Sequence, residues 1–176
     1  MHPTIMAAPC PIPLLIAHDA APTRRPRELS GHLQLRRGVY VPVQSWRALA
    51  PWDRYLARVH AVAAIRPGSV FCLESAAALH GLPVFGEPRN VHVFDPAAAR
   101  STSFGDIVVH TSQTPRTVGR LDHLDVVDSA DTVVDLARVL PPAFALATVD
   151  AAIASGHPAP VALETIVDRL YDVIVG

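Results

Sequence analysis

The chain has 176 residues, a length that fits one domain or one domain with a small appendage. All 15 of its basic residues are arginine. The absence of lysine excludes Schiff-base catalysis, a P-loop lysine and the lysine of the usual PD-(D/E)XK nucleases. The formal net charge is -1, but residues 1–66 hold nine arginines against three acids, whereas residues 67–176 hold six arginines against thirteen acids. This asymmetry is typical of a chain that meets a polyanion with one end.

The cysteines and the N-terminal segment indicate the compartment. Cys10 and Cys72 lie far apart in the sequence and fit neither a zinc site nor a disulfide framework, which favours a reducing compartment. The apolar run "PIPLLIAHDA" is short, is interrupted by proline and follows no basic segment. A signal peptide or a membrane span is therefore not expected. We expect a cytoplasmic protein without membrane contact.

The first 32 residues carry six prolines, which leave room only for short helical turns over residues 14–20 and 27–30. Arg24 and Arg25 precede the second turn as a basic arm, and Arg27 lies within it. This is the one candidate in the segment for an element that lies in the major groove of DNA. So short an element predicts weak, salt-sensitive binding with little discrimination between sequences.

The segment "LQLRRGVYVP", residues 33–42, predicts a β-hairpin. Arg36, Arg37 and Gly38 form its turn, and the aromatic and β-branched run that follows has high β-propensity. Pro42 cannot donate to a ladder, so the strand ends there. Guanidinium groups at a hairpin tip can reach phosphates or a narrow minor groove. The alternative is a solvated turn whose charges only aid solubility.

Helical spacing of apolar residues predicts an amphipathic helix of about four turns that ends at Pro67 and Gly68. Its apolar face is predicted to hold Trp52, Tyr55, Leu56, Val59, Val62 and Ala63. Arg54 and Arg58 lie four residues apart on its polar side. Such a pair is more often a solvated face than a contact to a nucleic-acid backbone.

The acidic part of the chain predicts alternating strands and helices. A buried strand "SVFCLE" precedes a short helix "AAALH", which Ser75 caps and Gly81 ends. The runs "NVHVF" and "DIVVH" predict an antiparallel pair, and "LDVVD" predicts a further strand. Three helices follow: "SADTVVDLARVL" behind a Ser129 cap, "PAFALATVDAAIASG" and "VALETIVDRLYDVIV".

No catalytic residue, metal or cofactor is expected. His92 and His110 could face each other across the predicted strand pair, but a metal site needs a third ligand and supporting groups. Ser75 and His80 lack the G-x-S-x-G elbow of a nucleophilic serine. Five aspartates cluster between residues 122 and 135, where Asp128 and Asp131 suit a helix N-terminus.

Several fragments together resemble a known family. The segments "LRRGVYVP", "LESAAALHGLP", "VHVF", "VVH", "TVVDLAR" and "DAAIASG" occur in the family's order and spacing. Over about residues 33–170 the chain resembles the AbiEi-like antitoxins, which are transcriptional regulators of type IV toxin-antitoxin systems of actinobacteria. The resemblance implies a DNA-binding transcriptional regulator that represses its own promoter. It also implies a functional link to a nucleotidyltransferase-like toxin, without direct binding.

The resemblance implies an α/β (α+β) fold in two parts. Residues 1–44 would form a partial winged helix-turn-helix with the hairpin as its wing, and residues 45–176 an antitoxin domain with a small mixed or antiparallel sheet packed against C-terminal helices. Together with the basic N-terminal segment, this predicts contacts to the duplex DNA of the chain's own promoter. The predicted DNA-contacting residues are Arg24, Arg25, Arg27, Arg36, Arg37 and Tyr40.

The chain departs from the family in three ways. Family members place three helices before the wing, whereas this chain has 32 proline-rich residues there. Asp131 replaces the arginine that usually precedes the threonine of "TVVDLAR", and the nuclease-like C-terminal extension of longer members is missing. The alternative is therefore an interaction module that does not bind DNA, or a remnant of a longer antitoxin-nuclease fusion. Nuclease activity is the weakest of the three hypotheses.

Overall fold

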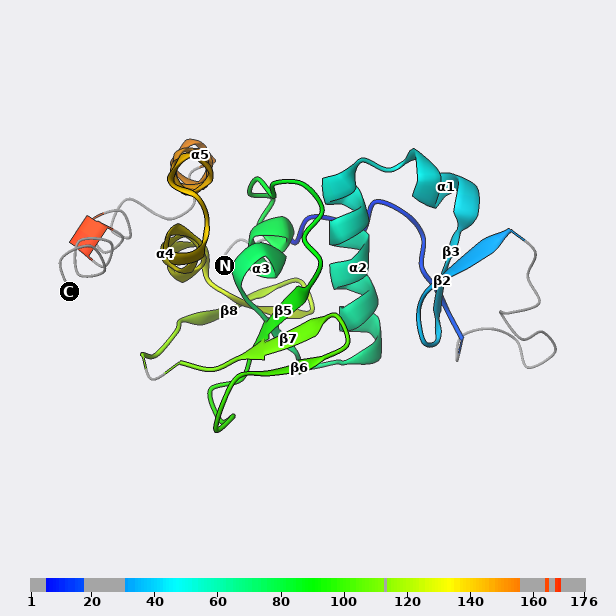
Figure 1. The fold of residues 1–176 in the computed structure, drawn as a ribbon, viewed down its shortest axis with the longest axis horizontal. Coiled ribbons are helices and arrows are strands. Elements are labelled where there is room, and N and C mark those ends of the chain that lie inside the picture. The colour runs from blue at the N-terminus through cyan, green and yellow to red at the C-terminus, as the bar shows by residue number, and fades with distance from the viewer. Residues whose placement is uncertain (1–5, 18–30, 113, 156–163, 165–166, 169–176) are drawn as a thin grey trace.

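The computed structural model describes residues 6–17, 31–112, 114–155, 164 and 167–168. These residues form a mixed α+β fold with five helices and two sheets, which confirms the predicted fold class in this broad form (Figure 1). No helix in the described part of the chain has the length and apolar character that crossing a membrane requires.

The smaller sheet contains the predicted hairpin. Its antiparallel strands are β1 (Leu15–Ile16), β3 (Val39–Pro42) and β2 (His32–Arg36), in that order across the sheet. Val39 and Val41 are fully buried. The strand ends at Pro42, as predicted, and Pro42 is also the N-cap of the short helix α1 (Val43–Ala48).

Helix α2 (Pro51–Ile65) lies between the two sheets (Figure 1). Pro51 occupies its first turn, where a missing N–H costs no helical hydrogen bond, and the helix ends before Pro67, as predicted. Tyr55, Val59 and Val62 belong to the main core, as predicted, and are fully buried. Trp52 is 55% exposed, so its predicted place on the buried face is wrong.

The larger sheet has six strands in the order β6-β7-β5-β4-β9-β8. Their bounds are β4 (Val70–Phe71), β5 (Val91–Phe94), β6 (Thr102–Phe104), β7 (Ile107–His110), β8 (Val118–Leu121) and β9 (Leu124–Val127). The predicted antiparallel pairing of "NVHVF" with "DIVVH" is wrong, because β5 and β7 pair in parallel. The physical reason is the unpredicted strand β6, which pairs antiparallel with β7 and reverses the chain a second time.

Helix α3 (Leu73–Leu79) follows β4 directly. The predicted Ser75 cap is wrong, because Cys72 is the N-cap and Ser75 lies inside the helix, fully buried. Ser75 Oγ lies 2.8 Å from the hydroxyl of Tyr55 and accepts a hydrogen bond of 2.8 Å from the backbone N–H of His92. The serine therefore joins α3 to both α2 and β5.

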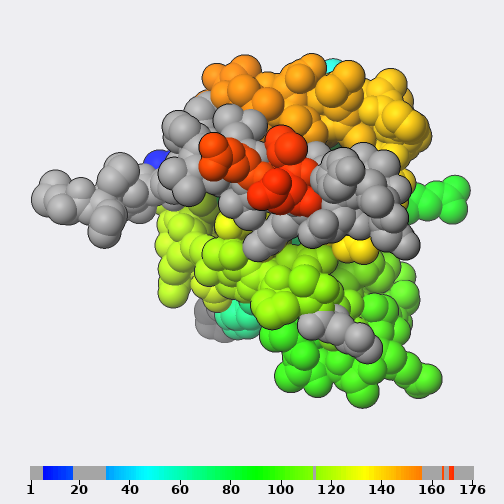
Figure 2. All heavy atoms as spheres, turned by 90° about the vertical axis from the view of Figure 1, so that its left-hand side faces the viewer, coloured from blue at the N-terminus to red at the C-terminus, as the bar shows by residue number. Residues whose placement is uncertain are grey.

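Helices α4 (Ser129–Val139) and α5 (Pro142–Ala154) pack beside α3, with α4 against α3 and α5 against α4. The predicted Ser129 cap lies one residue too far along the chain, because Asp128 is the N-cap. Figure 2 shows α5, in gold and orange, along one edge of this end of the molecule. The last predicted helix, "VALETIVDRLYDVIV", lies for the most part outside the described residues.

Two substitutions test the hydrogen bonds by which Ser75 joins α3 to α2 and β5. Tyr55→Phe removes one hydrogen bond and is expected to lower the free energy of unfolding by about 1 kcal/mol. Ser75→Ala leaves both the Tyr55 hydroxyl and the His92 N–H without this partner, so we expect a loss of at least about 2 kcal/mol. Urea unfolding of both variants measures the difference. Equal losses of unfolding free energy in the two variants would contradict the proposal that Ser75 bonds both Tyr55 and His92.

Candidate nucleic-acid interface

The turn of the hairpin carries an exposed arginine, Arg37. Arg37 and Gly38 form the turn between β2 and β3, and Gly38 adopts a φ of 83°, which glycine takes without strain. Arg37 is exposed, and no hydrogen bond or ion pair joins its guanidinium to another residue that the structure describes. Within the part of the chain that the structure describes, no acidic side chain pairs with its charge.

Arg36 does not lie free at the tip, which corrects the prediction that both arginines contact DNA. Its Nη2 atom donates to Asp106 Oδ2 at 2.6 Å, and its side chain is only 10% exposed. Asp106 follows Gly105 in the turn between β6 and β7. The pair therefore neutralises Arg36 and fastens the hairpin to the larger sheet.

Tyr40 is largely buried in the smaller sheet. It lies in β3, the central strand of the smaller sheet, and pairs with Leu15 on one side and Gln34 on the other. Only 7% of its surface is exposed. Tyr40 belongs to the core of this sheet, which leaves little of its surface for the predicted contact with DNA. The predicted contacts Arg24, Arg25 and Arg27 lie outside the described residues.

Arg54 and Arg58 on α2 have structural partners. Arg54 Nε donates to Trp46 O at 3.3 Å and its Nη2 donates to Arg47 O at 3.2 Å, which ties α1 to α2. Arg58 Nη1 donates to Arg89 O at 2.9 Å, and its Nη2 donates to Pro88 O. These contacts hold the segment before β5 against α2, so the two guanidinium groups are only partly available to a ligand.

The sequence reasoning missed a second group of residues at this end of the molecule. Arg66 ends α2, Arg100 lies in the connection from β5 to β6, and Phe104 lies in β6 with 61% of its surface exposed. All three line the same groove. The signal that pointed to β6 was the Gly105-Asp106 turn before the run "IVVH", which is typical of a hairpin.

His92 and His110 meet, across parallel rather than antiparallel strands. His92 Nδ1 lies 2.8 Å from His110 Nε2, and His92 Nε2 lies 3.6 Å from Glu74 Oε2. Burial lowers the pKa of both histidines, even though the Glu74 carboxylate lies beside them. Within the described residues, no group of three or more His, Cys, Asp or Glu side chains is placed to hold a metal ion.

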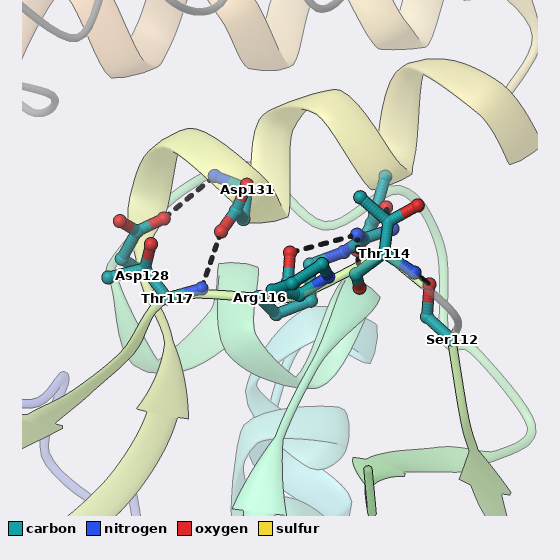
Figure 3. A network of polar contacts seen from close by, with 8 residues as sticks. Ser112, Thr114, Arg116, Thr117, Asp128 and Asp131 are labelled. Atoms are coloured by element: carbon teal, nitrogen blue, oxygen red, sulfur yellow. Dashed lines mark hydrogen bonds and ion pairs between the residues drawn. The ribbon is translucent and has the colours of Figure 1, made fainter.

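Three of the five clustered aspartates, Asp128, Asp131 and Asp135, have structural partners (Figure 3). Asp128 Oδ1 accepts from the Asp131 N–H at 2.8 Å, and Asp131 Oδ2 accepts from the Thr117 N–H at 2.7 Å. Arg116 donates to both oxygens of Asp135, at 2.9 and 2.8 Å. Their arrangement fixes α4 to the segment that leads into β8. The cap of α4 uses the backbone N–H of Asp131, whereas the bond to Thr117 uses its carboxylate.

No family model matches the chain, and neither a curated protein nor a solved structure matches it.

The histidine pair predicts how stability depends on pH. The unfolded rings take up protons near the ordinary pKa of 6.5, whereas the folded rings take them up at lower pH. The free energy of unfolding is therefore expected to be highest above pH 6.5 and to fall as the pH drops below it. Urea unfolding at a series of pH values measures this slope.

His110→Gln is expected to make the slope shallower, because it removes one titrating group and one half of the pair. Val108→Ala is the matched control, since Val108 lies opposite His92 on β7 and does not titrate. We expect it to lower stability equally at each pH. A wild-type slope in His110→Gln would contradict the role of the pair.

Proposed function

We propose that this chain is a DNA-binding transcriptional regulator that approaches duplex DNA with its hairpin as a wing. The observation that carries the proposal is the contrast between the two tip arginines. Arg36 is used to hold the hairpin on the larger sheet, while Arg37 is exposed and without a partner among the described residues. Because the hairpin is already fixed, binding of a phosphate by Arg37 requires no ordering of its backbone.

The charge around the hairpin supports the same proposal. Residues 31–66, which span the hairpin, α1 and α2, contain six arginines and a single acid, Asp53. The surface of this part is therefore electropositive, whereas most acids of the chain lie beyond it. Contacts of this kind bind the DNA backbone without reading its sequence.

The resemblance to the AbiEi-like antitoxins supplies the biological setting. In this proposal residues 1–44 are the partial winged helix-turn-helix and residues 45–176 the antitoxin domain. The chain acts in the cytoplasm on its own promoter, beside a nucleotidyltransferase-like toxin that it does not bind directly. Among the predicted contacts that the structure describes, Arg37 alone remains as a direct contact to DNA.

A second candidate is an interaction module that does not bind DNA. The observation that favours it is the group of exposed apolar side chains at the α4–α5 end: Val139, Phe144, Leu146 and Ile153. Exposed apolar clusters mark protein contact sites more often than nucleic-acid contact sites. This end is acidic and lies away from the hairpin, so the two functions would use different surfaces (Figure 1).

Arg37→Ala tests the proposed function. The variant is expected to weaken binding to the upstream DNA of its own gene and to shuffled duplex DNA alike. The slope of log affinity against log salt should fall by about one unit, which corresponds to one lost phosphate contact. Fluorescence anisotropy at several salt concentrations measures both quantities.

Arg120→Ala is the control, because Arg120 is also exposed, with one hydrogen bond of 3.3 Å to Asp122 O, but lies on β8, at the opposite edge of the larger sheet from β6. We expect it to leave affinity and salt slope close to those of the wild type. Equal losses in both variants would indicate a general charge effect and count against the wing. Undetectable binding by the wild type at low salt would remove the proposal altogether.

A further inference from the structure

An open groove lies beside the edge strand β6. Its volume is about 780 Å³, within the range of pockets that hold nucleotide-sized ligands. The end of α2, the start of β4 and the connection from β5 to β6 form its walls. Its polar side chains are Arg66, Ser69, Asp95, Arg100 and Thr102, and Phe104 supplies an aromatic ring.

The two arginines of the groove are free to bind an anion. Neither Arg66 nor Arg100 has a hydrogen bond or ion pair from its guanidinium to any residue that the structure describes, and both are exposed. Asp95 is the one carboxylate in the lining, and its Oδ1 already accepts from the Ala97 N–H at 2.9 Å. The groove therefore has an excess of positive charge, with planar donor groups that match a phosphate.

Phe104 gives this groove a second kind of contact. Its ring is 61% exposed although its strand partner Ile107 is buried at 5%. An exposed aromatic ring beside free arginines is the arrangement by which proteins bind unpaired nucleotides: the base stacks on the ring and the guanidinium groups hold the backbone. An apolar ligand would leave the two charges unused, and a simple anion would leave the ring unused.

One ion pair links the strand beside the groove to the proposed DNA-binding wing. Phe104 lies two residues before Asp106, and Asp106 holds Arg36 at the hairpin tip. Because Arg36 directly precedes the turn between β2 and β3, this bond ties that turn to the turn between β6 and β7.

We propose that the groove along β6 binds an unpaired nucleotide of a DNA strand, with the base on Phe104 and the phosphate between Arg66 and Arg100. The placement of this nucleotide in a DNA strand rests on the proposed function. The groove itself does not depend on it, because a free nucleotide offers the same base and phosphate. The experiment therefore compares duplex DNA, single-stranded DNA and a mononucleotide.

The test measures binding of the full chain to a fluorescent oligothymidylate, to a duplex of the same length and to thymidine monophosphate as competitor. Phe104→Leu keeps an apolar side chain but removes the ring, and is expected to weaken oligothymidylate binding about tenfold. Its duplex affinity is expected to stay that of the wild type. Phe104→Tyr keeps the ring and should retain oligothymidylate binding, which separates stacking from loss of fold.

The paired substitution Arg66→Gln with Arg100→Gln is expected to weaken oligothymidylate binding and to reduce its salt dependence. Arg120→Gln, on the far edge strand β8, should do neither. Oligothymidylate binding that is equal in wild type and Phe104→Leu overturns the groove assignment, while duplex binding that still depends on Arg37 leaves the proposed function intact.

Two further outcomes separate the hypotheses. If the protein binds oligothymidylate in a way that depends on Phe104 but does not bind duplex DNA, the groove assignment is supported. The proposal that the chain is a regulator that binds duplex DNA is then rejected. Thymidine monophosphate is compared with oligothymidylate at the same concentration of nucleotides. If both compete equally well, a free nucleotide is sufficient for binding, and the assignment of the groove to a DNA strand is overturned.

Discussion

The packing of α2 on two opposite sides holds this molecule together. Tyr55, Val59 and Val62 face the core under the larger sheet, while Ala57 belongs to the small core with Val41 of the hairpin. Position 57 lies about 200° around the helix from position 55, so a single helix can contact both sheets. Both contact positions are fully buried. The hairpin is therefore carried by a rigid helix and not by a flexible linker.

The position of the hairpin on α2 explains why Arg36 has a structural role while Arg37 remains exposed. Once α2 sets the hairpin beside the larger sheet, Arg36 reaches Asp106 in the turn between β6 and β7. The ion pair is largely desolvated on the arginine side, so breaking it would leave a poorly hydrated charge. Arg37, one residue further, is directed by the turn to a different environment and stays exposed. The turn of the hairpin therefore holds the backbone of the exposed Arg37 in a fixed position.

Local patterns predicted what depends on local physics. The hairpin, the ends of α2 and the helix at α4 followed from turn residues, proline positions and helical spacing. The pairing of β5 with β7 did not, because the three-residue strand β6 lacks a clear alternation and decides whether the chain reverses once or twice. The partner of Arg36 and the burial of Tyr40 depend on contacts between distant segments. The groove depends on three such segments at once, and no single stretch of sequence carries its signal.

The central claim concerns the surface that binds DNA. It is formed by the turn of the hairpin, the C-terminal end of α2 and strand β6. Backbone amide NMR spectra recorded during titration with duplex DNA carrying a single-stranded overhang test it most directly. The account predicts that shifts concentrate at residues 36–38, 65–69 and 100–105, while α4, α5 and β8 stay unchanged. Shifts confined to α4, α5 and β8, or spread evenly over the chain, would contradict it.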